Sequence, residues 1–166
     1  MHERLITLLL AGTVALPAAA ADLVPVKKVG VDLAAELAQH ALVACRKAGF
    51  QVSAVVVDRS GDTVAALRDD LASRHTLEIA YRKANAVILS GTSTGEFARN
   101  RADIVAKLDL VKDVLVLEGG LPVRAAGALV GAIGVSGAPG GDKDAACAQA
   151  ALDAVAERLE FADGDE

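Results

Sequence analysis

The sequence predicts an α+β fold in which helices flank one antiparallel sheet of five strands. Its extended segments form two groups with short connections, as in β-hairpins, rather than the long crossovers of a parallel sheet. The chain has 166 residues, a length typical of one domain. Its residues are 53% hydrophobic but only 2% aromatic, so alanine, valine and leucine must build the core and the helices must pack closely.

Hydrophobic periodicity and turn residues divide the chain into alternating helices and strands. In chain order, the predicted elements are a helix from Asp32 to Gly49, strands Val52–Asp58 and Thr63–Arg68, helices Ala72–Ser90 and 94–108, strands Lys112–Leu117, Pro122–Ala126 and Ala128–Val135, and a helix Lys143–Phe161.

Local signals in the N-terminal half support these boundaries. The first helix ends at Gly49, and the preceding Arg46 and Lys47 suit the negative end of the helix dipole. Residues 59–62 form a polar turn containing glycine, which predicts a hairpin between the first two strands. The second helix has an apolar stripe at helical spacing and ends at Gly91.

Signals of the same kind occur in the C-terminal half. Ser93 begins a capping box that predicts a third helix extending to about Leu108. Gly127 separates two short extended runs, as a hairpin loop would. The run Ala128–Val135 has no polar face, so we expect this strand to be covered on both sides. Asp142 is predicted to cap the last helix.

Residues 1–21 have the features of a secretory signal peptide. Arg4 precedes the apolar run Leu5–Leu16, which is too short to span a bilayer, and 18–20 supply small residues for cleavage. The alternative, a buried N-terminal helix, is less consistent with that cleavage site. We therefore expect one domain at 22–166, periplasmic or secreted and not held in a membrane after signal removal.

The charge and the motif content exclude several functions. The net charge is −5 and basic residues are scattered, which argues against a nucleic-acid partner. The sequence lacks the nucleophile elbow of α/β-hydrolases, the dinucleotide-binding fingerprint and the zinc-protease motif. Whether the protein is an enzyme is left undecided at this stage.

Cys45 and Cys147 are the only cysteines, and both fall on predicted helices. An exported protein would meet oxidising conditions, so a disulfide between them is possible. Two buried thiols acting as small hydrophobic residues are the alternative. We slightly favour the thiols, because the sequence does not place the sulfurs within bonding distance.

A glycine-rich segment near the C-terminus resembles a known family. GGLPV at 119–123 is followed by GALVGAIGVSGAPGGDKDAACA at 127–148, and VSAVVVDRSGDTVAALRDD and HTLEIAYRKANA lie upstream. Together these segments resemble the GlcG/HbpS-like family of small haem-binding proteins, some of which degrade haem. The resemblance covers about 32–156 and implies a profilin-like sheet, haem as partner and assembly into homo-oligomers.

Haem iron takes histidine, cysteine, methionine or tyrosine as axial ligands. After signal removal the candidates are His40, His75, Tyr81 and the two cysteines. His75 is the first choice for the metal ligand, because it begins a helix and the resemblance implies a recurrent HTL–RKA pattern here. A packing or capping role for His75 is about equally compatible with the sequence. Core packing is favoured for Tyr81, and a surface position for His40.

Haem propionates require cations or backbone N–H donors. Arg82 and Lys83 follow His75 by about two helical turns, and Arg74 adjoins it. The helix start after 140–141 also offers free N–H groups. Lys83 ranks first among the cations because it matches the family pattern, although solvent-exposed or structural roles are the alternative for all three.

Two further classes of function remain open on the sequence alone. One is a binding module for a corrinoid or another non-haem metabolite, and the other is a structural oligomer without ligand. Glu157 and Glu160 share a helix face, a spacing that some family members use for iron, although surface helices carry it very commonly.

Overall fold

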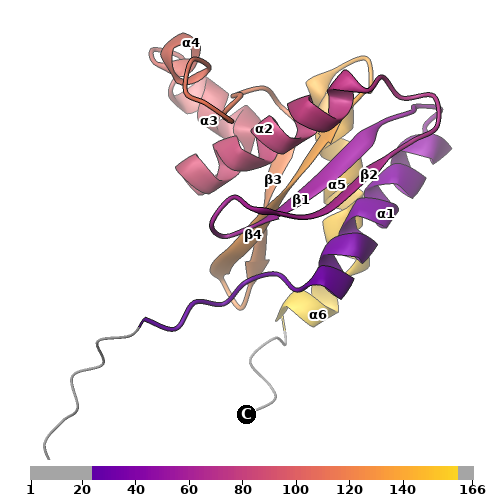
Figure 1. Ribbon diagram of the computed structural model, residues 1–166, viewed down its shortest axis with the longest axis horizontal. Coiled ribbons are helices and arrows are strands. Elements are labelled where there is room, and N and C mark those ends of the chain that lie inside the picture. Colours follow the sequence, from indigo (N-terminus) through magenta and orange to yellow (C-terminus); the bar gives the residue numbers. More distant parts are fainter. Residues whose placement is uncertain (1–23, 161–166) are drawn as a thin grey trace, which may run out of the picture.

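The computed structural model describes residues 24–160, in which a four-stranded antiparallel sheet lies between helices on both faces (Figure 1). The strands are in the order β2-β1-β4-β3. In chain order the elements are α1 (Val31–Lys47), β1 (Ser53–Asp58), β2 (Thr63–Arg68), α2 (His75–Ser90), α3 (Thr94–Asn100), α4 (Val105–Leu108), β3 (Gly120–Ala125), β4 (Ala128–Ser136), α5 (Gly141–Ala154) and α6 (Ala156–Glu160).

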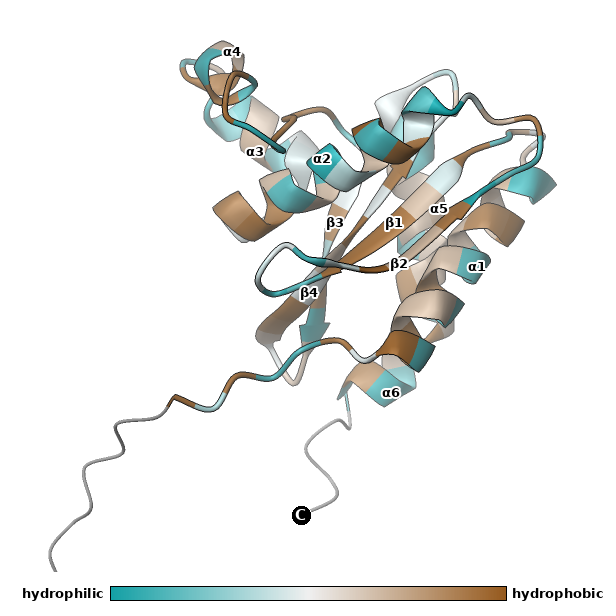
Figure 2. Ribbon diagram, in the orientation of Figure 1, coloured by the Kyte–Doolittle hydropathy of each residue, from teal (hydrophilic) through white to brown (hydrophobic). Residues whose placement is uncertain are grey.

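Alternate residues of the two central strands face opposite layers of helices. Ala54 and Val56 of β1 pack in the larger core with α1 and α5, whereas Val55 and Val57 pack against α2. Every residue of β1 is buried, and Figure 2 shows that the strand is hydrophobic along most of its length. The expectation that β4 is covered on both faces is confirmed, since its residues from Val130 onward are all buried.

The hairpin between β3 and β4 turns at two residues with positive φ. Ala126 has φ 45° and Gly127 has φ 82°, as in a two-residue turn of the primed type. The predicted separation of the two strands at Gly127 is therefore confirmed.

Helix α2 approaches β4 so closely that one strand position excludes a side chain. A Cβ atom on Gly134 would lie 1.9 Å from the carbonyl oxygen of Ala80. Glycine at this position lets the helix backbone contact the sheet, which fixes the depth at which α2 lies.

The prediction of five strands is wrong, because Lys112–Leu117 does not join the sheet. Two of its backbone N–H groups instead donate hydrogen bonds to α2 and to Asp109. The Leu115 N–H donates to the carbonyl oxygen of Arg82 (3.1 Å), and the Val116 N–H donates to the Asp109 carboxylate (2.8 Å). Val114 and Val116 are buried against Ala86, so the apolar run serves a local cluster rather than a strand.

Both predicted long helices near the C-terminal half are interrupted. The Ser93 side chain accepts a hydrogen bond from the Glu96 N–H, which confirms the cap, but α3 ends at Asn100. The break before α4 brings Phe97 and Val105 onto one cluster.

The last helix is likewise divided between α5 and α6. Val155 leaves the helical conformation (φ −120°), and the break places Leu159 so that its carbonyl accepts from the Ala126 N–H at 3.0 Å. The prediction that Asp142 caps this helix is wrong, because the N-cap is Gly140 and Asp142 lies in the first turn.

Cys45 and Cys147 form a disulfide that joins α1 to α5, with their Cα atoms 5.4 Å apart. The preference for two free thiols is therefore wrong. The two helices pack side by side on one face of the sheet, and this packing brings together sulfurs that are 102 residues apart in the sequence.

The signal-peptide prediction for 1–21 concerns residues outside those that the structure describes. Within 24–160, every helix is too short or too polar to span a bilayer.

Candidate functional site

Helix α2 carries the four residues that the sequence analysis selected, and the structure distributes them among different environments. His75 is the first residue of the helix and its side chain is exposed. Tyr81 is half-buried and packs on the cluster that contains Val55 and Val57 of β1. The core-packing interpretation of Tyr81 agrees with this position.

Arg82 anchors the segment that follows α4. Its guanidinium donates hydrogen bonds to the carbonyl oxygens of Asp109 (3.2 Å) and Val114 (2.8 Å). The side chain is only partly exposed, and its donors are used to hold a loop. Arg82 thus lies two helical turns from His75 and binds loop carbonyl oxygens, whereas His75 is exposed.

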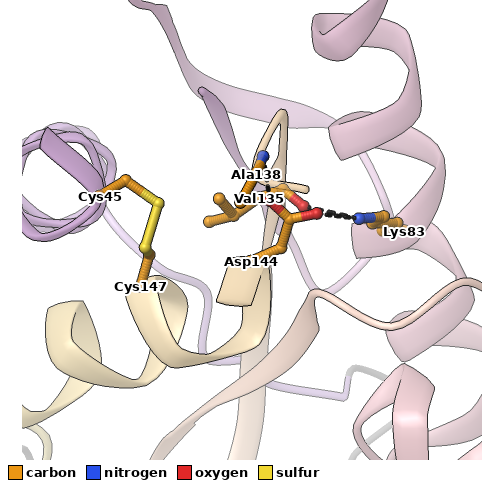
Figure 3. The surroundings of a disulfide bond; sticks show 6 residues. All are labelled: Cys45, Lys83, Val135, Ala138, Asp144 and Cys147. Carbon is orange, nitrogen blue, oxygen red and sulfur yellow. Dashed lines mark hydrogen bonds and ion pairs between the residues drawn. A yellow bond between two sulfur atoms is a disulfide. The ribbon is translucent and has the colours of Figure 1, made fainter. Parts of the chain in front are cut away.

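Lys83 lies inside the protein, where it pairs with Asp144 of α5 (Figure 3). The lysine side chain is 1% exposed and the aspartate side chain 4%, and Nζ lies 2.8 Å from Oδ2. Nζ also donates to the carbonyl oxygen of Val135 at 2.9 Å, and Asp144 Oδ1 accepts from the Ala138 N–H at 3.0 Å. The pair therefore ties α2 to the loop between β4 and α5, and its ammonium lies inside the protein rather than at the rim where a cation for a propionate was expected.

Desolvation dominates the electrostatics of this pair. Burial lowers the pKa of Lys83, against the hydrogen bond and attraction of Asp144 and the more distant charge of Glu118. Burial raises the pKa of Asp144, against the opposing effects of Lys83 and the Ala138 N–H. Each charged group is thus stabilised mainly by the other. Removing one partner would leave the other as an unpaired charge inside the protein, which lowers the free energy of unfolding.

The double glycine of the family-like motif makes room for this pair. Gly119 has φ 125°, and a Cβ atom there would lie 2.7 Å from Lys83 Nζ and 2.8 Å from Asp144 Cβ. The neighbouring Gly120 N–H donates to the hydroxyl of the buried Thr94 at 3.0 Å. The packing of the buried charge pair therefore explains the first glycine of the motif.

Sequence reasoning found Lys83 but missed its partner and its environment. Lys83 lies three residues after Ala80 and four before Val87, both fully buried, so its position on the apolar stripe already indicated burial. Asp144 carried no such signal, because an aspartate in a first helical turn is ordinary on dipole grounds alone.

The other candidate ligands are dispersed over the described part of the chain. His40 is exposed on α1, and Glu157 and Glu160 are exposed on α6. Both cysteines are engaged in the disulfide. No group of three or more histidine, cysteine or acidic residues that could hold a metal ion occurs among residues 24–160.

Two apolar cavities open on the side of the sheet covered by α1 and α5, and His75 lines neither. One, of about 280 Å³, lies between α1 and α5, beside the disulfide. The other, of about 330 Å³, has an apolar floor and a cationic rim formed by Lys27, Lys28 and Arg158.

Comparison with known proteins shows which family has this glycine-rich motif and this fold. A family model described as "Haem degrading protein HbpS-like" matches residues 29–153. The chain belongs to the HbpS-like family. The resemblance stated from the motifs at 119–123 and 127–148 is confirmed.

Solved structures of the family superpose closely on this fold. A crystal structure of HbpS is 36% identical, covers 84% of this chain and 99% of its own, and has a TM-score of 0.77. A double mutant of Streptomyces reticuli HbpS is 34% identical, with coverage of 87% and 99% and a TM-score of 0.77.

A Klebsiella pneumoniae protein, ORFY, is 26% identical, with coverage of 84% and 98% and a TM-score of 0.75. None of the curated proteins matches this chain.

Proposed function

We propose that this protein binds haem, with His75 as an axial ligand of the iron. The observation that carries the proposal is membership of the HbpS-like family, whose description names haem degradation, together with 36% identity to HbpS. Bound haem would supply a redox-active iron centre, and the polypeptide would supply the ligand and the surroundings.

The chemistry of the available side chains supports His75. The disulfide engages both cysteine sulfurs, and Tyr81 of α2 packs on the core cluster that contains Val55 and Val57 of β1. An exposed imidazole at the start of a helix can approach iron without disturbing the core. His40 is exposed as well but lies on α1, which covers the opposite face of the sheet.

The surface around His75 supports a site that a second copy of the chain completes. Leu71 is 84% exposed and Arg74 is exposed, so an apolar contact and a cation for a propionate lie close to His75 in the sequence. Among the cavities described above none is lined by His75, so a haem ring held by His75 would leave its other face open. We therefore propose a homo-oligomer in which a neighbouring subunit covers the second face.

We also propose that the protein acts outside the cytoplasm, in the periplasm or after secretion. The pattern of residues 1–21 supports export. The Cys45–Cys147 disulfide supports it as well, because such bonds persist mainly in oxidising compartments.

Absorption spectroscopy tests the haem proposal directly. The purified protein is titrated with haemin and compared with His75→Ala and with the matched control His40→Ala, which removes another exposed imidazole. We expect a saturable Soret shift in the wild type and in His40→Ala, and its loss in His75→Ala. Adding a reductant and oxygen to the loaded protein then tests whether the haem is degraded.

The other outcomes have distinct meanings. Saturable binding that survives in His75→Ala would refute the ligand assignment but keep haem as the partner. Weak, unsaturable association in the wild type would refute haem binding and favour a module for a corrinoid or another metabolite. Gel filtration with and without haemin tests the oligomer independently.

A further inference from the structure

The disulfide borders a cavity that opens between the C-terminal end of α1 and the first half of α5. The cavity has a volume of about 280 Å³, and Cys147 is one of its lining residues whereas Cys45 is not. Four alanines and Phe50 form the rest of its apolar wall. This space is larger than the roughly 150 Å³ that accommodates benzene in a protein interior, so a small molecule can reach the Cys147 side.

The two sulfurs of the disulfide therefore differ in access. Both cysteines belong to the buried main core, but Cys147 (5% exposed) lines the cavity, whereas Cys45 (0% exposed) does not. Exchange of a disulfide begins with attack of a thiolate on one sulfur, and access decides which sulfur is attacked. The geometry favours Cys147.

Lys143 adds a charge to the same cavity. It precedes Cys147 by one helical turn on α5, lines the cavity and remains about half exposed. Its ammonium lies 3.8 Å from the carboxylate of Asp142, which is 72% exposed and does not line the cavity. A cation in the wall of the same cavity favours the approach of an anionic thiolate.

We propose that Cys147 is a thiol-exchange site that takes a low-molecular-weight thiol, such as a tripeptide thiol, into this cavity. The incoming thiolate forms a bond to Cys147 Sγ, the Cys45–Cys147 bond breaks, and its electron pair leaves on Cys45 Sγ, which takes up a proton. A second thiolate then attacks the external sulfur of the mixed disulfide, releasing the symmetrical disulfide and the Cys147 thiolate.

The fold is built to survive this exchange. Asp144 lies three residues before Cys147 and holds the first turn of α5 to α2 through the buried Lys83 (Figure 3). Opening the disulfide removes the covalent link between α5 and α1, whereas the packing of these two helices, the ion pair and the hydrogen bond to Ala138 remain. The proposal is independent of haem binding.

A pair of matched variants tests the asymmetry. Cys45→Ser leaves Cys147 as a free thiol facing the cavity, and Cys147→Ser leaves Cys45 as a free thiol in the core. Both variants lose the same disulfide, and urea denaturation of each gives the unfolding free energy needed to correct the two rates for global opening. Under native conditions we expect an aromatic disulfide reagent to modify Cys147 at least about tenfold faster than Cys45, because the buried thiol reacts only after local opening. Equal rates, or a faster Cys45, would overturn the proposal.

The wild-type protein provides the second test. After incubation with reduced glutathione and acid quenching, peptide mass spectrometry should locate the mixed disulfide on Cys147. Ala146→Leu fills the cavity and should slow its formation, whereas Ala35→Leu, an exposed change on α1, should not. A mixed disulfide on Cys45, or a rate that Ala146→Leu does not change, would refute the route through the cavity.

Discussion

Replacing Lys83 by methionine removes half of the buried ion pair while keeping the length and most of the apolar volume of the side chain. Asp144 then retains the hydrogen bond from Ala138 but loses its counter-charge. Its side chain is 4% exposed, so bulk water solvates the carboxylate very little. The variant therefore isolates the cost of one unpaired carboxylate inside the fold.

We expect Lys83→Met to lower the free energy of unfolding by about 3–5 kcal/mol, the cost of breaking a buried pair from one side. The double variant Lys83→Met with Asp144→Asn has no buried charge and should be more stable than Lys83→Met alone. Lys47→Met, which removes an exposed lysine of α1, should change the stability by no more than about 0.5 kcal/mol.

The pH dependence of the same variant gives an independent signature. Burial already raises the pKa of Asp144, and loss of the ammonium raises it further. At pH values between the pKa of Asp144 in the unfolded chain and its higher pKa in the folded protein, Asp144 carries a proton in the folded state but not in the unfolded state. The stability of Lys83→Met therefore falls as the pH rises through this window, and its deficit is smaller at pH 5 than at pH 7.

Urea denaturation at both pH values measures these quantities. A loss of less than about 1 kcal/mol in Lys83→Met would refute the assignment of a buried, mutually dependent pair. A double variant that is no more stable than Lys83→Met would refute it as well, because the loss would then come from altered packing.

Three further predictions concern the scaffold. Hydrogen bonds from Lys28 and from the turn lower the pKa of Asp58, so its carboxylate stabilises the fold at and above the ordinary range of an aspartate. This effect is lost as the pH falls below that range, and acid titrations of the wild type and Asp58→Asn should converge there. Gly134→Ala should destabilise the protein by at least about 1–3 kcal/mol in urea, because its methyl group would meet the Ala80 carbonyl oxygen at 1.9 Å; an unchanged midpoint would show that α2 can shift. The double variant Cys45→Ser, Cys147→Ser should lose about 2–5 kcal/mol, since the bond closes a loop of 102 residues, and a thermal midpoint equal to that of the wild type would contradict this.

Much of the secondary structure could be predicted from local patterns. The strand Thr63–Arg68 has the predicted bounds, and Ser93 caps a helix as its capping box indicates. Such signals depend on hydrogen bonds and side-chain periodicity within a few residues, so the sequence carries them directly.

The secondary-structure predictions were wrong where the same local pattern is compatible with more than one tertiary arrangement. The run Lys112–Leu117 is buried in part, as a strand would be, but it begins in a turn at Asp113 (φ 64°) and its backbone bonds to α2 and Asp109 instead of a sheet. The helix that was predicted to extend to about Leu108 ends at Asn100, and the break brings Val105 onto the same cluster as Phe97.

The sequence by itself determined the family, the antiparallel α+β class and a central strand covered on both faces. Only the tertiary structure decided that Lys83 meets Asp144, 61 residues away, and that Cys45 meets Cys147, 102 residues away. Both contacts are set by how α2, α1 and α5 pack on the two faces of one sheet. The physical reason is that a side chain's charge state, partners and access depend on burial, which arises from all the elements together.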